Sequence, residues 1–123
     1  MGLGDPAGLV EVVAAGIDMF DCVLPTRHAR HGGVLTSAGR LNLRNARFAT
    51  DDSPLDPEFP SSPAARWSRS YLRHLLMTDE PTGGRLLTLH NLAWLLNFVD
   101  RLRMSIETGT FESFRRDTLA VWG

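Results

Sequence analysis

The sequence predicts an α/β chain that forms part of a larger fold. A mostly apolar helical segment at residues 7–15 leads directly into a short apolar segment at 17–24, rich in Ile, Phe and Val, which predicts a buried strand. A glycine-bounded hairpin follows at 34–43, and everything after Pro63 has helical spacing. A helix that runs into a strand is the unit of an α/β fold. Because one strand and one hairpin cannot close a parallel sheet, we expect the neighbouring strands to lie outside these 123 residues.

Composition places the chain among ordinary globular proteins. Hydrophobic residues make up 43% and charged residues 22%, which excludes collagen-like, disulfide-scaffold and disordered classes. Cys22 is the single cysteine, so no intrachain disulfide can form and a reducing compartment is expected. No apolar run is long enough to span a membrane, and no secretory signal is visible at the start. We therefore expect a cytoplasmic protein with no membrane partner.

Local signals bound the individual elements. Asp5-Pro6 has the form of a helix start, with Asp as N-cap and Pro at the first helical position, and Gly16 suits the C′ position. Strands at 34–36 and 40–43 flank a turn that contains Gly39.

The second half of the chain reads as a loop followed by helices. Residues 49–63 hold four prolines and no periodicity, which predicts a long loop that is either functional or mobile. Apolar spacing predicts helices around 67–76, 85–107 and 111–121. We divide the chain into 1–48, with strand, helix and hairpin, a proline-rich loop at 49–63, and a helical part at 64–123.

The basic charge is concentrated in one window. All 13 basic residues are arginine, and the window from 22 to 50 has five arginines and no acid, followed by four acids within 51–58. Such a window suits a surface that contacts phosphates. A solvated hairpin whose arginines meet nearby carboxylates explains the charge pattern as well, and charge alone favours this second interpretation. The five arginines are Arg27, Arg30, Arg40, Arg44 and Arg47.

Asp21 is the residue best placed for chemistry. It lies at the carboxyl end of the predicted strand, where catalytic groups gather in α/β folds, so it is a candidate nucleophile, base or metal ligand. A turn residue that caps the loop is the equal alternative. Asp18 would face the opposite side of a strand, so the two carboxylates are not expected to form a pair. Cys22 is more typical of a small buried residue than of a thiol nucleophile.

Metal and phosphate signals are weak. The histidines, at positions 28, 31, 74 and 90, and the single cysteine show no zinc-binding spacing. The segment Met1-Gly2-Leu3-Gly4 precedes a helix, but it lacks both the third glycine and the preceding strand of a dinucleotide-binding loop.

Several blocks of sequence resemble one family. Gly-Ile-Asp-Met-Phe-Asp-Cys-Val-Leu-Pro-Thr-Arg at 16–27, Leu-Asn-Leu-Arg-Asn-Ala-Arg at 41–47 and Trp-Ser-Arg-Ser-Tyr-Leu-Arg-His-Leu at 67–75 closely resemble bacterial queuine tRNA-ribosyltransferases, the tRNA-guanine transglycosylases. Met-Gly-Leu-Gly at 1–4 and Leu-His-Asn-Leu at 89–92 resemble them too. The resemblance implies the C-terminal third of a (β/α)8 TIM barrel, with a β-hairpin and a helical subdomain.

The resemblance also implies a reaction and its residues. The family exchanges the wobble guanine of tRNA for a 7-deazaguanine precursor of queuosine, and its nucleophile matches Asp21. Met1 and Gly2 match residues that line the base pocket, and Arg27 and Arg30 match residues that hold the anticodon loop. The implied partners are the tRNA anticodon loop and a guanine-type base. Arginine suits this RNA because it contacts phosphate bidentately and stacks on splayed bases.

The family's zinc site is degenerate in this sequence. The resemblance implies Cys-x-Cys-x-x-Cys and a downstream histidine as ligands, and the matching positions are Phe59, Ser61, Ala64 and His90. A single imidazole cannot hold a structural zinc, so we predict no metal and no cofactor. The helical subdomain would then be held by packing alone.

Three functional interpretations stay open. The chain is the catalytic end of a transglycosylase, which acts as a homodimer or with a complementary N-terminal barrel chain. Alternatively, it is a non-catalytic paralogue that binds tRNA or dimerises, or the product of a truncated or split gene. Because the guanine-recognising and acid/base residues of the family fall outside these 123 residues, we expect no base exchange by the isolated chain.

Overall fold

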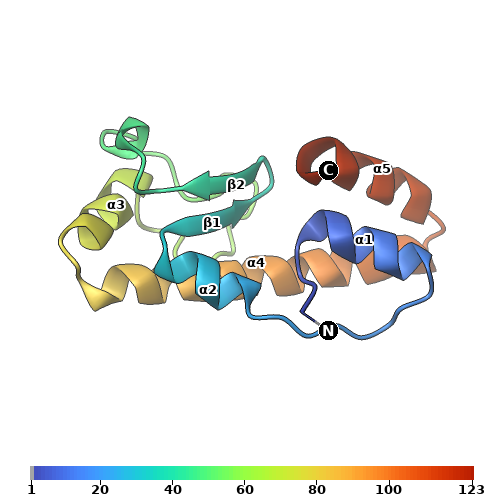
Figure 1. The fold of residues 1–123 in the computed structure, drawn as a ribbon. Helices are drawn as coiled ribbons and strands as arrows, with labels where there is room; N and C mark the ends of the chain where they lie inside the picture. The colour runs from blue at the N-terminus through green and yellow to red at the C-terminus, as the bar shows by residue number, and fades with distance from the viewer. Residues whose placement is uncertain (1) are drawn as a thin grey trace. The chain divides into compact units, whose positions relative to one another are not determined.

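A computed structural model describes residues 2–123, which form five α-helices, one 3-10 helix and a two-stranded sheet (Figure 1). The chain divides into two compact units. The central unit is Pro25–Leu95, and the terminal unit combines Met1–Leu24 with Leu96–Gly123. The mixed helical and small-sheet architecture agrees with the coarse class expected from the sequence.

The predicted hairpin is confirmed in the central unit. Strand β1 (Gly33–Thr36) pairs antiparallel with β2 (Gly39–Asn42), and Thr36 opposite Gly39 closes a two-residue turn. All four residues of β1 are buried. Ser37 and Ala38 form the turn, and Gly39, which follows them as the first residue of β2, has φ of 113°, a conformation that favours glycine. In Figure 1, β1 lies between β2 and the long helix α4 (Pro81–Glu107).

Side chains of α4 hold β1 by its backbone. Asn91 accepts a hydrogen bond from Leu35 N at 3.0 Å, and its amide nitrogen donates to the carbonyls of Gly33 at 3.0 Å and Pro25 at 3.1 Å. Asn91 is fully buried, so these bonds satisfy its amide and three backbone groups that water cannot reach. Around them lies the apolar core, which comprises Ala29, Val34, Leu43, Phe48, Leu55, Ala64, Leu72, Leu75, Leu76, Leu86 and Leu87.

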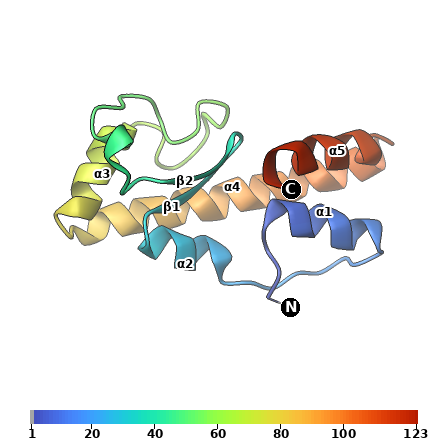
Figure 2. The same cartoon turned by 45° about the horizontal axis from the view of Figure 1, so that its top comes forward.

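The predicted loop is also confirmed, because residues 49–63 contain no helix or strand (Figure 2). The loop is packed and hydrogen-bonded rather than loosely held. Leu55 is fully buried, and the buried carboxylate of Asp56 accepts bonds from the Ser37 backbone and hydroxyl, both at 2.8 Å, and from Trp94 Nε1 at 2.9 Å. A buried carboxylate is costly unless donors surround it, and here the donors join the loop to the hairpin turn and to α4.

The first and last helices of the chain pack together in the terminal unit. Helix α1 (Pro6–Ala14) begins with Asp5 as N-cap, whose carboxylate accepts from Gly8 N at 2.9 Å, as predicted. Helix α5 (Phe111–Trp122) packs beside α1 (Figure 1), and Arg115 forms an ion pair with Glu11 at 2.8 Å. The Phe98 and Phe114 rings lie 5.4 Å apart.

The predicted strand at 17–24 is wrong. Residues 17–23 form neither helix nor strand, and helix α2 (Leu24–Arg30), which the sequence did not predict, begins at Leu24. A strand needs a neighbour to pair its backbone groups. The two strands of residues 2–123 pair only with each other, so no strand of the described chain lies beside this segment to form a sheet with it. The prediction that Asp21 lies at the carboxyl end of a strand is therefore wrong as well.

The remaining helices agree with the predicted ranges, but their exposed faces differ. Helix α3 spans Arg69–Met77, and α4 begins four residues before the predicted start. Tyr71, Leu89 and Leu96, which belong to the apolar spacing that predicts these helices, are exposed. Within the described residues, none of the helices combines the length and apolarity that crossing a membrane requires.

Candidate functional site

Two segments that the sequence marks separately meet in the terminal unit. The backbone N–H of Gly2 donates a hydrogen bond to the carbonyl of Asp21 at 2.5 Å. A Cβ at Gly4 would lie 1.9 Å from Cys22 Sγ, so the first residues run directly against the segment around Asp21. Gly2 and Asp21, both expected site residues, are therefore neighbours. Met1, the other residue expected in the base pocket, lies outside the described residues.

Packing explains the glycines of the first segment. Gly2 has φ of 77°, which side chains rarely tolerate, and Gly4 leaves no room for a Cβ beside Cys22. A phosphate-binding role is not needed to account for either glycine.

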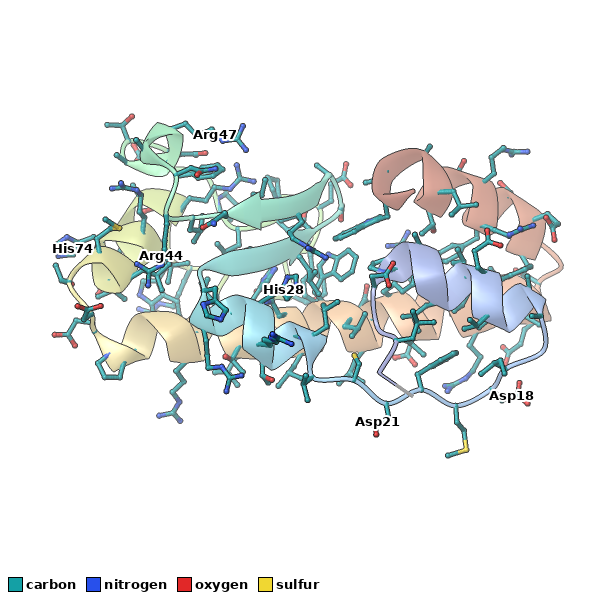
Figure 3. The ribbon with its side chains drawn as sticks, in the orientation of Figure 1. Asp18, Asp21, His28, Arg44, Arg47 and His74 are labelled. Carbon is teal, nitrogen blue, oxygen red and sulfur yellow. The ribbon has the colours of Figure 1, made fainter. Side chains whose placement is uncertain are left out.

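The carboxylate of Asp21 is open to solvent. Its side chain points away from the ribbon, and so does that of Asp18 (Figure 3). Among residues 2–123, neither carboxylate forms a hydrogen bond or an ion pair. An exposed carboxylate without an internal partner can accept a metal, act as a base or attack an electrophilic carbon. Cys22 is only partly buried.

The basic window forms a hollow in the central unit. This basic hollow has a volume of about 450 Å³ and its wall contains no acidic residue. In the described chain, no carboxylate lies within ion-pair distance of Arg27, Arg40 or Arg47. The alternative in which these arginines meet neighbouring carboxylates is therefore wrong for these three. The lining residues are Arg27, His28, His31, Gly33, Arg40, Leu41, Asn42, Asn45 and Arg47.

The basic side chains around the hollow act on the pKa of His28. Partial burial, then the charges of Arg40, Arg27 and His31, lower the pKa of His28 below its ordinary value. Arg47 also stacks over the Phe48 ring, with its guanidinium carbon 4.6 Å from the centroid, which orients the side chain at the rim. Arginine side chains with amide donors beside them suit a phosphate-bearing ligand.

The hollow includes some expected residues and omits others. Arg27 lines it, whereas Arg30 and Arg44 are exposed and do not. Sequence reasoning considered His28 and His31 only as metal ligands and missed their place here. The signal that could have found them is their position inside the acid-free window; His28 lies on the unpredicted helix α2 (Figure 3), and His31 follows directly after it.

The residues at the positions of the implied zinc site do not fit a metal. His90 is fully buried, with Nδ1 2.7 Å from Ser62 Oγ and Nε2 2.8 Å from the Leu35 carbonyl. The centroids of the Phe59 and His90 rings lie 6.0 Å apart, and the side chain of Ala64, which is buried, has no atom that can bind a metal. Burial lowers the pKa of His90, which favours the neutral ring. Across residues 2–123, no cluster of three or more His, Cys, Asp or Glu side chains could hold a metal ion.

Comparison with known proteins identifies the family. The model of the family described as queuine tRNA-ribosyltransferase matches residues 1–123. Queuine tRNA-ribosyltransferase of Agrobacterium fabrum is 50% identical over 99% of this chain, that of Caulobacter vibrioides 48% over 98%, and that of Streptococcus suis 46% over the whole chain. The chain belongs to the queuine tRNA-ribosyltransferase family. It spans about a third of the length of these curated relatives, 32% in each of the three.

Proposed function

We propose that the chain is the C-terminal part of a tRNA-guanine transglycosylase and supplies the nucleophile, Asp21. One observation carries the proposal: Asp21 and Gly2, both matched by resemblance to the family's active site, are adjacent through a backbone hydrogen bond, and the Asp21 carboxylate is exposed and unpaired in the described chain. The family match over residues 1–123 supports the same assignment.

The chemistry needs a carboxylate in two displacements. A carboxylate oxygen of Asp21 attacks C1′ of the wobble ribose, and the C1′–N9 bond breaks with its electron pair leaving on guanine. The N9 of the incoming 7-deazaguanine or guanine then attacks C1′ and gives up its proton, which balances the proton that the departing guanine takes up, and the C1′–O bond breaks to restore the carboxylate. Two inversions at C1′ give overall retention.

The basic hollow supplies the RNA-binding part of the proposal. A single-stranded anticodon loop presents phosphates and splayed bases, and arginine serves both. Arg27 lines the hollow beside Arg40 and Arg47, and we assign to the hollow the binding of the tRNA backbone. Arg30, also matched to the family's tRNA-binding residues, lies on the same helix α2 outside the hollow.

No strand of the described chain pairs with the segment at 17–23, which fits a (β/α)8 barrel in which neighbouring strands come from the rest of the protein. In that context the division at residues 48 and 63 separates barrel, loop and helical subdomain. A homodimer or a complementary N-terminal barrel chain would complete the site, in the cytoplasm where tRNA is modified.

Incorporation of labelled guanine into a tRNA with a guanine wobble base tests the function. The 123-residue chain is assayed alone and with a separately expressed N-terminal barrel part of a relative. We expect no exchange by the chain alone, because the groups that recognise and protonate guanine are missing, and activity after complementation.

Asp21→Asn and Asp18→Asn form a matched pair, since both remove an exposed carboxylate from one segment. Asp21→Asn should abolish exchange, with a loss of at least a thousandfold, while Asp18→Asn leaves it within about twofold. Equal activity of the two variants would contradict the assignment of Asp21. The basic hollow favours one second function, a non-catalytic tRNA-binding paralogue, and tRNA binding without exchange in any complemented mixture would support it.

A further inference from the structure

We propose that a metal-free hydrogen-bonded lock, Ser62–His90–Leu35, joins the loop, helix α4 and strand β1 in place of a structural metal. The lock lies wholly in the central unit, and the resemblance puts His90 where the family has its zinc-binding histidine. The geometry around the imidazole carries the proposal.

The partners of His90 fix its tautomer. The Leu35 carbonyl can only accept, so Nε2, 2.8 Å away, carries a proton and donates. Ser62 Oγ, which accepts from Ala64 N at 3.1 Å, donates its own proton to Nδ1 at 2.7 Å. Both ring nitrogens are therefore used, and the single lone pair of the neutral ring already accepts a hydrogen bond. A metal would have to break the Ser62 bond to reach Nδ1 or the Leu35 bond to reach Nε2.

The surroundings of the ring offer no replacement ligands. Phe59 packs edge-on against it, Ala64 is buried and apolar, and Ser61 is exposed and forms none of the lock's bonds. The carboxylate of Asp56, on the same loop, already accepts hydrogen bonds from Ser37 and Trp94. The space that thiolates would need is thus filled with carbon, and the remaining polar atoms bond to one another.

The lock performs the task of a structural metal, because it ties together segments that are distant in sequence. Ser62 lies 28 residues from His90, and Leu35 lies 55 residues from it. Asn91, the next residue, holds the N–H of the same Leu35, so two adjacent side chains of α4 grip both polar groups of one residue of β1. Breaking the chain of bonds would leave buried groups unsatisfied.

Two neighbouring serines give a matched test on the 123-residue chain. Ser62→Ala removes the bond to Nδ1, whereas Ser61→Ala changes an exposed position that the resemblance equates with a zinc ligand. We expect Ser62→Ala to lower the thermal unfolding midpoint by about 5 °C and Ser61→Ala to change it by less than about 1 °C. Adding equimolar zinc or excess chelator to the wild-type chain should leave its midpoint unchanged.

A second measurement keeps the proposal testable should Ser62→Ala fail to fold. Imidazole ¹⁵N shifts of the wild-type chain at neutral pH should identify His90 as the neutral tautomer with the proton on Nε2, before and after addition of zinc. A stoichiometric zinc that raises the unfolding midpoint, a zinc-induced change in the His90 shifts, or equal losses in the two serine variants would each overturn the lock. None of these readouts involves tRNA or base exchange, so they stand apart from the proposed function.

Discussion

At the scale of single residues, the arginines of the basic hollow decide whether the acid-free window binds RNA or is merely solvated. Arg40→Ala and Arg27→Ala should each weaken binding of a substrate tRNA by about 1 to 3 kcal/mol, because each removes a charged contact to phosphate. Wild-type affinity should fall steeply with added salt, and the slope should be shallower in both variants. Fluorescence anisotropy at several salt concentrations measures both effects.

Arg85→Ala is the matched control. It removes the same charge from an exposed residue of the same unit, and Arg85 does not line the hollow. Its affinity should stay within about twofold of wild type, given that distant surface charges are screened. A loss equal to that of Arg40→Ala would show that net charge, rather than the hollow, determines binding.

His28 makes the same site pH-dependent. Burial and the nearby charges of Arg40, Arg27 and His31 lower its pKa in the free chain, so the ring is neutral near pH 7. A phosphate in the hollow adds negative charge and raises that pKa, so binding takes up a proton. We expect tRNA affinity to rise as pH falls from 7.5 to 6 and this rise to be smaller in His28→Gln. His74→Gln, outside the hollow, is the control, and an unchanged pH profile in His28→Gln would exclude proton uptake by His28.

At the scale of elements, the hairpin depends on α4 more than on its own turn. Strand β1 has one partner strand, and a lone two-stranded hairpin is marginal in water. Its other side is held by side chains of α4, chiefly Asn91. This attachment explains how a four-residue strand can be buried along its whole length.

Asn91→Ala should therefore destabilise the chain by about 3 kcal/mol, because it leaves the Leu35 N–H and two carbonyls unsatisfied in the interior. Asn97→Ala is the control, an exposed asparagine on the same helix, and it should be neutral or slightly stabilising through helix propensity. Urea unfolding followed by circular dichroism measures both. Equal stability of the two variants would mean that the hairpin does not need the hydrogen bonds of Asn91.

At the scale of the whole molecule, the segment at 17–23 stands out because it exposes apolar side chains and belongs to no sheet. Ile17, Met19 and Val23 are 49%, 86% and 65% exposed on a stretch of backbone that no strand of the described chain pairs with. Exposed apolar side chains on a segment outside any sheet or helix favour association with another chain. This is the surface that the barrel context of the proposed function would cover.

We accordingly expect the 123-residue chain to self-associate at tens of micromolar, as measured by sedimentation velocity. The pair Met19→Ser and Val23→Ser should reduce the associated fraction, because it removes exposed apolar surface from the segment. Met77→Ser, an equally apolar change at an exposed position of α3, should not. A monomeric wild-type chain, or equal effects of the two sets, would contradict this role of the segment.

The sequence alone determined the family and those local elements that short-range signals define. Asp5-Pro6 specified a helix start and Gly39 a hairpin turn, because capping and turn chemistry act within a few residues. The blocks around Asp21 and Arg27 were specific enough to indicate the family, which the match over residues 1–123 confirms. Tertiary structure decided what depends on distant partners. Residues 17–23 have strand-like composition, but no strand of the described chain lies beside them. Ser62, His90 and Asn91 acquire their roles only because α4 lies against the loop and β1. Hydrogen bonds across 28 to 66 residues of sequence leave no periodic pattern, so the sequence analysis expected packing alone where His90 and Asn91 form buried hydrogen bonds.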